Sequence, residues 1–162
     1  MIALRLGRLD VQVVPGNPTR VTFAGRIDDS TNFGELQRQI PPGDLVIDTG
    51  AVTFINSIGM REWMRLLRGL QGRTVSLERV ADVLMTQLNM IRDSTKGTRI
   101  VSFHAQYVCP NCGAETAPLV DAVAHAHLLR QMQAPRLPCP ECGSAMELGD
   151  FAERYLTIFR SP

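Results

Sequence analysis

The motif C-P-x-C-G occurs twice, at residues 109–113 and 139–143, and it constrains the fold more than any other feature of the chain. Two residues between the thiols let one tight turn present both sulfurs to a single ion, and the glycine that follows allows a left-handed turn. The motifs use every cysteine of the chain. They predict a tetrahedral metal site whose ligands are Cys109, Cys112, Cys139 and Cys142.

The expected ion is zinc, which needs no redox partner, and its expected role is structural, because four thiolates leave no open position for water or substrate. Iron takes the same ligand set, so the sequence leaves it as an alternative. Disulfides or free thiols are the other interpretation, and a reducing cytosol disfavours disulfides. His125 and His127 are two positions apart, which places them on different faces of a helix, and we do not expect them or His104 to be ligands.

Composition indicates an ordinary globular chain, with 44% hydrophobic and 20% charged residues. A formal net charge of +1 gives no general reason to expect binding to nucleic acid or anionic membranes. The N-terminus alternates apolar and polar residues, unlike a signal peptide, and no apolar stretch is long enough to span a bilayer. We therefore expect a cytoplasmic protein without a membrane span.

The first two thirds of the chain alternate between strand and helix patterns. Strands are expected at 2–6, 9–14, 20–25, 45–47, 74–77 and 99–108, and helices after the capping cluster at 30–32, from Ser57 to Leu70, and at 81–91. Asn32 and Glu35 resemble a capping box. The order β-β-β-α-β-α-β-α-β predicts an α/β fold, a mixed sheet covered by helices.

The C-terminal third carries the predicted four-cysteine zinc-ribbon or knuckle module. Between the two motifs, Leu119–Met132 has a helical pattern, and the final segment is too apolar for a free tail. We therefore divide the chain into a domain at 1–107, a zinc-ribbon-like module with a helical insertion at 108–148, and a segment at 149–162 that docks back on the core.

The segment Asp44–Leu70 places a serine where a helix begins. An apolar run at 45–47 ends at Asp48, and a second apolar patch at 52–55 leads into Asn56 and Ser57. Apolar residues spaced three or four apart follow, with Trp63 on the core stripe. A serine at this position caps the helix through its hydroxyl, and the positive end of the helix dipole favours an anion there. Ser57 is therefore either a plain N-cap or the acceptor of a phosphate.

The same residues resemble the STAS domain, found in anti-sigma factor antagonists and in the cytoplasmic tails of sulfate transporters. The family pattern is close to V-x-F-[IM]-D-S-[ST]-G, and Val52–Gly59 matches it with Asn56 in place of the aspartate and Ile58 in place of the second hydroxyl residue. Gly25–Asp28 resembles the family's G-x-[IL]-D. The resemblance covers roughly the first 107 residues and implies that a partner kinase phosphorylates Ser57.

The resemblance and the charge pattern together select a partner-binding surface. Its expected members are Asp28, Asn56, Ser57, Gly59, Arg61 and Arg65. Arg61, Arg65 and Arg68 form a stripe opposite the core stripe, and Arg61 lies four residues after Ser57, within reach of a phosphate. The alternatives are that Asp28 only terminates a turn and that the arginines are a solvated face.

We expect a non-enzymatic, bacterial-type signalling adaptor that binds a serine kinase or an anti-sigma-like factor, with a homodimer as a further expectation. The alternative is a nucleic-acid or transcription-associated protein that binds through the zinc ribbon. That alternative is disfavoured because Arg130 and Arg136 are the only cations between the two motifs. Enzymatic activity is disfavoured because the chain has no catalytic triad order, paired acids or phosphate loop.

Overall fold

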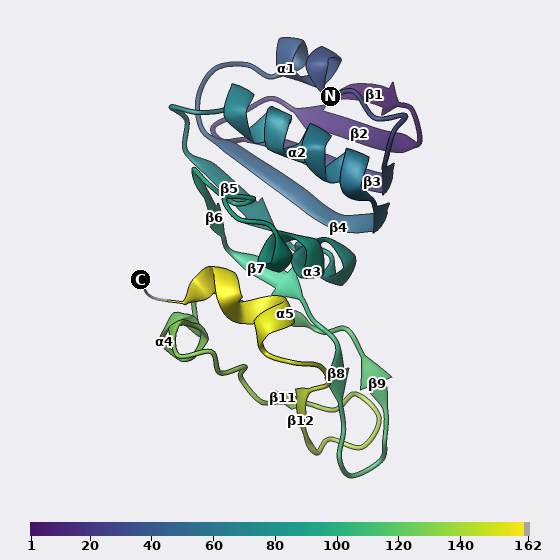
Figure 1. The fold of residues 1–162 in the computed structure, drawn as a ribbon, viewed down its shortest axis with the longest axis vertical. Helices are drawn as coiled ribbons and strands as arrows, with labels where there is room; N and C mark the ends of the chain where they lie inside the picture. The colour runs from purple at the N-terminus through teal and green to yellow at the C-terminus, as the bar shows by residue number, and fades with distance from the viewer. Residues whose placement is uncertain (161–162) are drawn as a thin grey trace.

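The computed structural model describes residues 1–160 and contains a six-stranded mixed sheet in the order β1-β2-β3-β4-β5-β6 (Figure 1). β2 is antiparallel to its two neighbours, β1 and β3, and β3 to β6 run parallel. The strands are β1 (Ile2–Leu6), β2 (Leu9–Val14), β3 (Thr19–Ile27), β4 (Leu45–Ile55), β5 (Val75–Glu78) and β6 (Thr98–Ile100).

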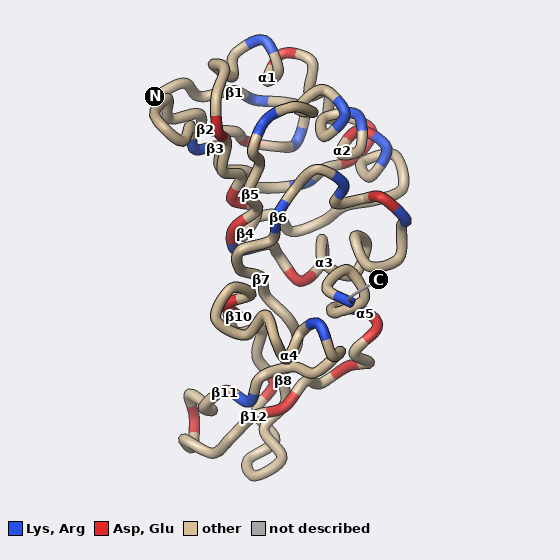
Figure 2. The backbone as a smooth tube through the Cα atoms, turned by 90° about the vertical axis from the view of Figure 1, so that its left-hand side faces the viewer, with Lys and Arg blue, Asp and Glu red and all other residues tan. Residues whose placement is uncertain are grey.

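Three helices cover one face of this sheet: α1 (Gly34–Gln39), α2 (Ser57–Gly69) and α3 (Asp82–Met90), which lie to one side of the strands in Figure 2. Strand β2 shows why only one face is covered, because buried Val11 and Val13 alternate with exposed Asp10 and Gln12. The predicted α/β fold class and the predicted order of elements are confirmed as far as β6.

The expected continuous strand at 99–108 is wrong. The segment is divided into β6, β7 (Ser102–His104) and β8 (Tyr107–Val108), and each belongs to a different sheet. β6 pairs with β5, β7 pairs with β10 (Leu119–Asp121), and β8 pairs with β12 (Ala145–Leu148) and β9 (Glu115–Thr116). Alternating apolar residues indicate which face of a strand is buried but not which strand it pairs with. The sequence pattern therefore could not predict the breaks between β6 and β7 and between β7 and β8.

The expected helix at 119–132 is also wrong over most of its length. The segment begins as β10, turns, and forms only the short helix α4 (Ala126–Arg130). The Asp121 carboxylate Oδ1 accepts hydrogen bonds from the backbone N–H groups of Val123 and Ala124, at 3.0 and 2.9 Å. An aspartate that binds the backbone two and three residues ahead stabilises a turn in place of a helix.

The C-terminal segment packs on α3 through α5 (Glu153–Leu156) and the 3₁₀ turn η1 (Thr157–Phe159). The Ile158 N–H donates to Asn89 Oδ1 at 3.0 Å, and the Phe159 ring lies 5.3 Å from that of Phe103. Residues 161–162 of the predicted docking segment 149–162 lie outside the described residues. The two predicted domain boundaries, after residues 107 and 148, remain predictions. Among residues 1–160, no helix is both long and apolar enough to cross a membrane.

Candidate metal centre

The two cysteine motifs form knuckles with the same backbone geometry. The first follows β8 and the second follows β11 (Leu137–Pro138). In the first, the Cys109 N–H donates to the Ala114 carbonyl at 2.8 Å, and the Gly113 N–H donates to the Cys109 carbonyl at 2.8 Å. The equivalent bonds of the second knuckle measure 2.7 and 2.9 Å. Each closing glycine is left-handed, with φ of 77° at Gly113 and 78° at Gly143, where a side chain would be strained.

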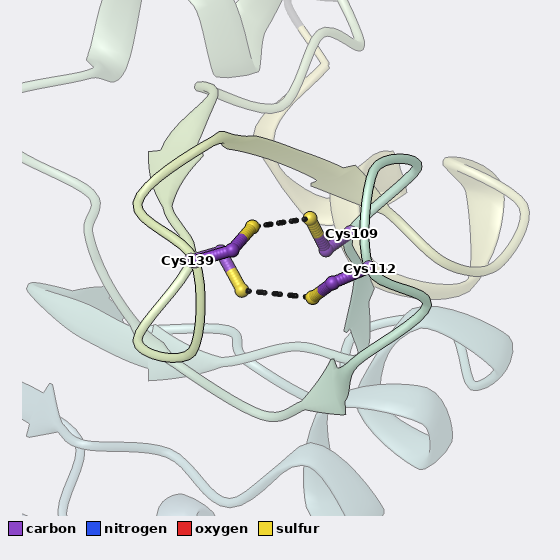
Figure 3. A group of neighbouring side chains, drawn as sticks. Cys109, Cys112 and Cys139 are labelled. Carbon is purple, nitrogen blue, oxygen red and sulfur yellow. Dashed lines mark hydrogen bonds between the residues drawn. The ribbon is translucent and has the colours of Figure 1, made fainter.

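The knuckles bring four free thiols together (Figure 3). The Sγ atoms of Cys109 and Cys142 lie 3.6 Å apart, as do those of Cys112 and Cys139, and all four lie within 4.8 Å of one another. A disulfide needs about 2.05 Å between its sulfurs. Tetrahedral ligands about 2.3 Å from an ion are separated by roughly 3.8 Å. The spacing therefore fits four ligands of one metal ion.

The site is half enclosed. Cys109 and Cys139, the first cysteine of each knuckle, are buried, whereas Cys112 and Cys142 are exposed. The buried pair belongs to the hydrophobic core, and the exposed pair opens the cluster to solvent. An ion bound here would be fixed from one side and accessible to a chelator from the other.

Two hydrogen bonds to sulfur add to the geometry. The Asn111 side-chain amide donates to Cys142 Sγ at 3.5 Å, and the Glu141 backbone N–H donates to Cys139 Sγ at 3.4 Å. The bond from Asn111, followed by those from Ser144, lowers the pKa of Cys142 to about 6, so its thiolate is favoured at neutral pH. Groups that orient and charge a ligand tune the affinity of a metal site. The sequence did not predict a role for Asn111, because it occupies the variable position of the C-P-x-C-G motif.

Cys112 shows the opposite effect. Its backbone hydrogen bond with Ala114 lowers its pKa, but desolvation and the three neighbouring thiols outweigh that bond and raise the pKa to about 12. Four thiolates this close repel one another unless a cation neutralises them. Binding of an ion must therefore displace protons from the cluster.

The three histidines lie apart from this cluster, as the sequence predicted. Within the described residues, the group of cysteines, histidines and acids close enough to share an ion contains only the four cysteines. His104 Nδ1 is hydrogen-bonded to the Ala117 carbonyl oxygen at 2.8 Å. His125 and His127 lie at the start of α4.

The residues predicted for partner binding lie on a different part of the molecule, around the start of α2. Asn56, and not Ser57, is the N-cap: its Oδ1 accepts from the Gly59 N–H at 2.8 Å. Ser57 is the first residue of the helix and is exposed. The idea that the Ser57 hydroxyl caps the helix is therefore wrong by one residue, because asparagine caps as well as serine does.

Two of the predicted partner residues are buried. A Cβ on Gly59 would lie 2.1 Å from the Ile27 carbonyl oxygen, so the glycine allows α2 to approach the end of β3. Asp28 is 1% exposed, and its Oδ1 accepts from the Ser30 hydroxyl at 2.6 Å and the Ser30 N–H at 2.9 Å. These bonds, with a further bond from Arg8, lower the pKa of Asp28 to about 2. The contacts support the interpretation of Asp28 as a turn residue.

Arg61 and Arg65 are exposed on the outer face of α2, next to Ile58, which is 45% exposed. Arg65 is bonded to Glu62 at 2.8 Å, and within the described residues no carboxylate lies within ion-pair distance of Arg61. The start of α2 therefore presents a hydroxyl, an apolar side chain and a free guanidinium on one surface. Neither a protein-family model nor a curated protein matches the chain.

Proposed function

We propose that this chain is a non-enzymatic signalling adaptor of the STAS type, which binds a partner protein in the cytoplasm. The observation that carries the proposal is the exposed Ser57 at the first position of α2, freed from capping by Asn56. A kinase can reach such a hydroxyl, and a phosphate there would keep the cap bond in place. The helix dipole favours the added negative charge.

Arg61 supports the same proposal because it is exposed and lies one turn after Ser57. A phosphate on Ser57 would be neutralised in part by this guanidinium, so the helix would stay folded. The modification would then act on the partner, through its charge and bulk at the docking surface. A serine kinase or an anti-sigma-like factor fits this chemistry, and a homodimer remains a prediction.

For the metal centre, we propose one structural zinc ion held by Cys109, Cys112, Cys139 and Cys142. The spacing of the sulfurs and the two closed knuckles support it, because zinc accepts four thiolates in a tetrahedron without a redox partner. When bound, the ion would join β8 to the segment before β12 and stabilise the folded knuckles.

Nucleic-acid binding through the knuckles is the weaker alternative. Glu115, Glu141 and Glu147 are exposed in or beside the knuckles. Carboxylates at these positions repel phosphates, and a phosphate-binding surface needs clustered lysines and arginines.

The experiment that tests the proposal places a photo-crosslinking amino acid at Ile58, isolates the crosslinked partner and measures its affinity for purified variants. Ser57→Asp should weaken binding about tenfold or more, because the new negative charge repels the partner. A tenfold loss of affinity corresponds to roughly 1.4 kcal/mol of binding free energy. Ser57→Ala adds no charge and should change the affinity little. The matched control is Gln12→Glu, which adds the same charge on the exposed face of the sheet.

Equal affinity of the partner for wild type and Ser57→Asp would contradict the switch. Equal weakening by Gln12→Glu would assign the effect to net charge and not to the start of α2. Mass spectrometry of protein purified from its own cells, searched for phosphate on Ser57, gives an independent measurement.

A further inference from the structure

A second surface lies at the other end of α2, around the loop Ile91–Gly97. Three adjoining hollows of about 200, 300 and 540 Å³ surround this loop, and Lys96 borders all of them. We call the three hollows together the Lys96 groove. It runs from the last turns of α2, past the starts of β5 and β6, to η1. Because a helix rises about 1.5 Å per residue, Arg68 lies roughly 16 Å along α2 from Ser57.

The groove is basic at its rim. Arg68, Arg73, Arg92 and Lys96 line it, and Asp93 is its one acidic lining residue among residues 1–160. Arg73 donates to the Pro41 carbonyl at 2.7 Å. Within the described part of the chain, no carboxylate lies within ion-pair distance of Arg68, Arg92 or Lys96. Three cations at one concave surface therefore form no ion pair in the described part of the chain, and a single carboxylate, that of Asp93, lines the groove with them.

The walls of the groove are apolar. Leu67 borders the two hollows beside α2, and Ile158 and Met90 border the largest one. Met90 is 72% exposed, an unfavourable position for a flexible apolar side chain unless another surface covers it.

The loop that carries Lys96 is anchored at its centre. Ser94 is buried, its hydroxyl donates to the Leu88 carbonyl at 2.6 Å, and its carbonyl accepts from the Trp63 indole N–H at 3.0 Å. These bonds tie the loop to both α3 and α2. A surface that is already formed costs less conformational entropy when it binds.

We propose that the Lys96 groove binds an acidic amphipathic segment of a partner protein, with its carboxylates on Arg68, Arg92 and Lys96 and its apolar side chains against Met90 and Ile158. Charge complementarity selects an acidic ligand, and the apolar walls select a peptide over a nucleic acid, which needs aromatic side chains for stacking. Three shallow hollows around a protruding lysine also differ from the single enclosed cavity of a small-molecule site. The proposal deepens the proposed adaptor function by giving the chemistry of a partner.

The sequence offers a direct test, because Lys96 is the only lysine of the chain. The probe is a synthetic 16-residue peptide, roughly four helical turns, with Glu on one face and Leu on the other. A carbodiimide couples its carboxylates to amines in contact, so the coupling site in the full-length protein should be Lys96 and not the N-terminal amine. Fluorescence anisotropy measures the affinity of the same peptide.

We expect the peptide to bind in the micromolar range and the affinity to fall about tenfold with Lys96→Glu and with Arg68→Glu, the loss typical of reversing one charge in a docking site. Met90→Asp should weaken binding similarly by removing the apolar contact and adding repulsion. The matched control is Arg130→Glu, a charge reversal at an exposed arginine of α4, which should leave the affinity within about twofold.

Several results would overturn the proposal. They are binding no tighter than that of a scrambled peptide of the same composition, equal weakening by Arg130→Glu, tighter binding of single-stranded DNA, or self-association of the protein that Lys96→Glu abolishes. Ser57→Asp should leave peptide binding unchanged. Failure at the groove and failure of the Ser57 switch are therefore separate outcomes.

Discussion

At the scale of single residues, Gly59 determines how α2 meets the sheet. The glycine lies in the first turn, where the Ile27 carbonyl and the Asn56 cap both approach the backbone. The resemblance put Gly59 among partner residues, whereas its surroundings assign it to packing. The small space between α2 and the Ile27 carbonyl explains the glycine at position 59, two residues after Ser57, without contact to a partner.

Gly59→Ala should therefore destabilise the protein. The new Cβ would lie 2.1 Å from the Ile27 carbonyl oxygen, so helix and strand must separate. Overpacking of this kind costs about 1–3 kcal/mol, more than the helix propensity that alanine adds. Urea unfolding measures the change.

Gly69→Ala is the matched control in the same helix, because its Cβ would meet only the end of the flexible Gln37 side chain. A neutral or stabilising effect is expected there. Equal losses at the two positions would show that the Ile27 contact is not the cause.

Asp28 gives a second prediction at this scale, on stability in acid. Its pKa falls from 3.8 to about 2 in the folded protein, so its contribution to stability is complete above pH 3.8 and is lost as the pH falls through about 2. Urea unfolding between pH 5 and pH 2, roughly the window of this titration, should show a steeper decline for wild type than for Asp28→Asn. The exposed neighbour Asp29→Asn is the control, and parallel curves for wild type and Asp28→Asn would contradict the assignment.

At the scale of elements, the two knuckles repeat one backbone turn but differ in how they contact sulfur. Asn111 uses its side chain, whereas Glu141, at the equivalent position of the second knuckle, uses its backbone N–H. The sequence shows the repeat but not this difference, because the side-chain bond crosses from one knuckle to a cysteine of the other.

Asn111→Ala should consequently weaken zinc affinity about 10–100-fold, the usual effect of losing a group that supports a metal ligand. It should also raise the pKa of the Cys142 thiol, because the largest influence that lowers this pKa is removed. Competition with a coloured chelator measures the affinity. Glu141→Ala is the matched control and should bind zinc as wild type does, since its backbone bond survives; weakening of both variants alike would contradict the distinction.

At the scale of the whole molecule, α3 connects the sheet to the metal centre. Strand β12 leads from the second knuckle into α5, α5 packs on α3, and the Gly149 N–H donates to the Gln106 carbonyl at 2.8 Å. The Tyr107 hydroxyl, buried beside the first knuckle, donates to the Pro135 carbonyl at 2.7 Å. Metal binding should therefore influence α3, which borders the Lys96 groove through Met90.

Removal of the ion should loosen the C-terminal part and α3 but leave β1 to β3 intact. Metal analysis should first find one zinc per chain. After chelation, hydrogen exchange should become faster in β8, β12, α5 and α3, because local stability depends on the contacts that remain. Amides of β1 to β3, which contact none of these elements closely, are the internal control. Uniform acceleration across the chain would contradict the coupling through α3, and absence of zinc would contradict the proposed ion.

The order of the first nine elements and the grouping of the four cysteines could be predicted from the sequence alone. These features depend on local periodicity and on spacing within a few residues, which the chain carries without reference to its partners. For example, the two-residue spacing of Cys109 and Cys112 places both in one turn, whatever the position of the second knuckle.

The strand pairing after Ile100, the cap of α2 and the roles of Asp28 and Gly59 become visible in the folded protein and not in the sequence pattern. The breaks at Val101 and Ala105 follow from partners more than ten residues away, and the roles of Asp28 and Gly59 follow from Ser30 and Ile27. The Lys96 groove likewise combines α2, the loop Ile91–Gly97 and η1. Long-range packing places Gly59 against Ile27, pairs the strands after Ile100 and builds the groove, and no local pattern in the chain encodes such contacts. The bonds of Ser30 to Asp28 and of Gly59 to Asn56 are local, but the sequence leaves open which of several capping residues forms them.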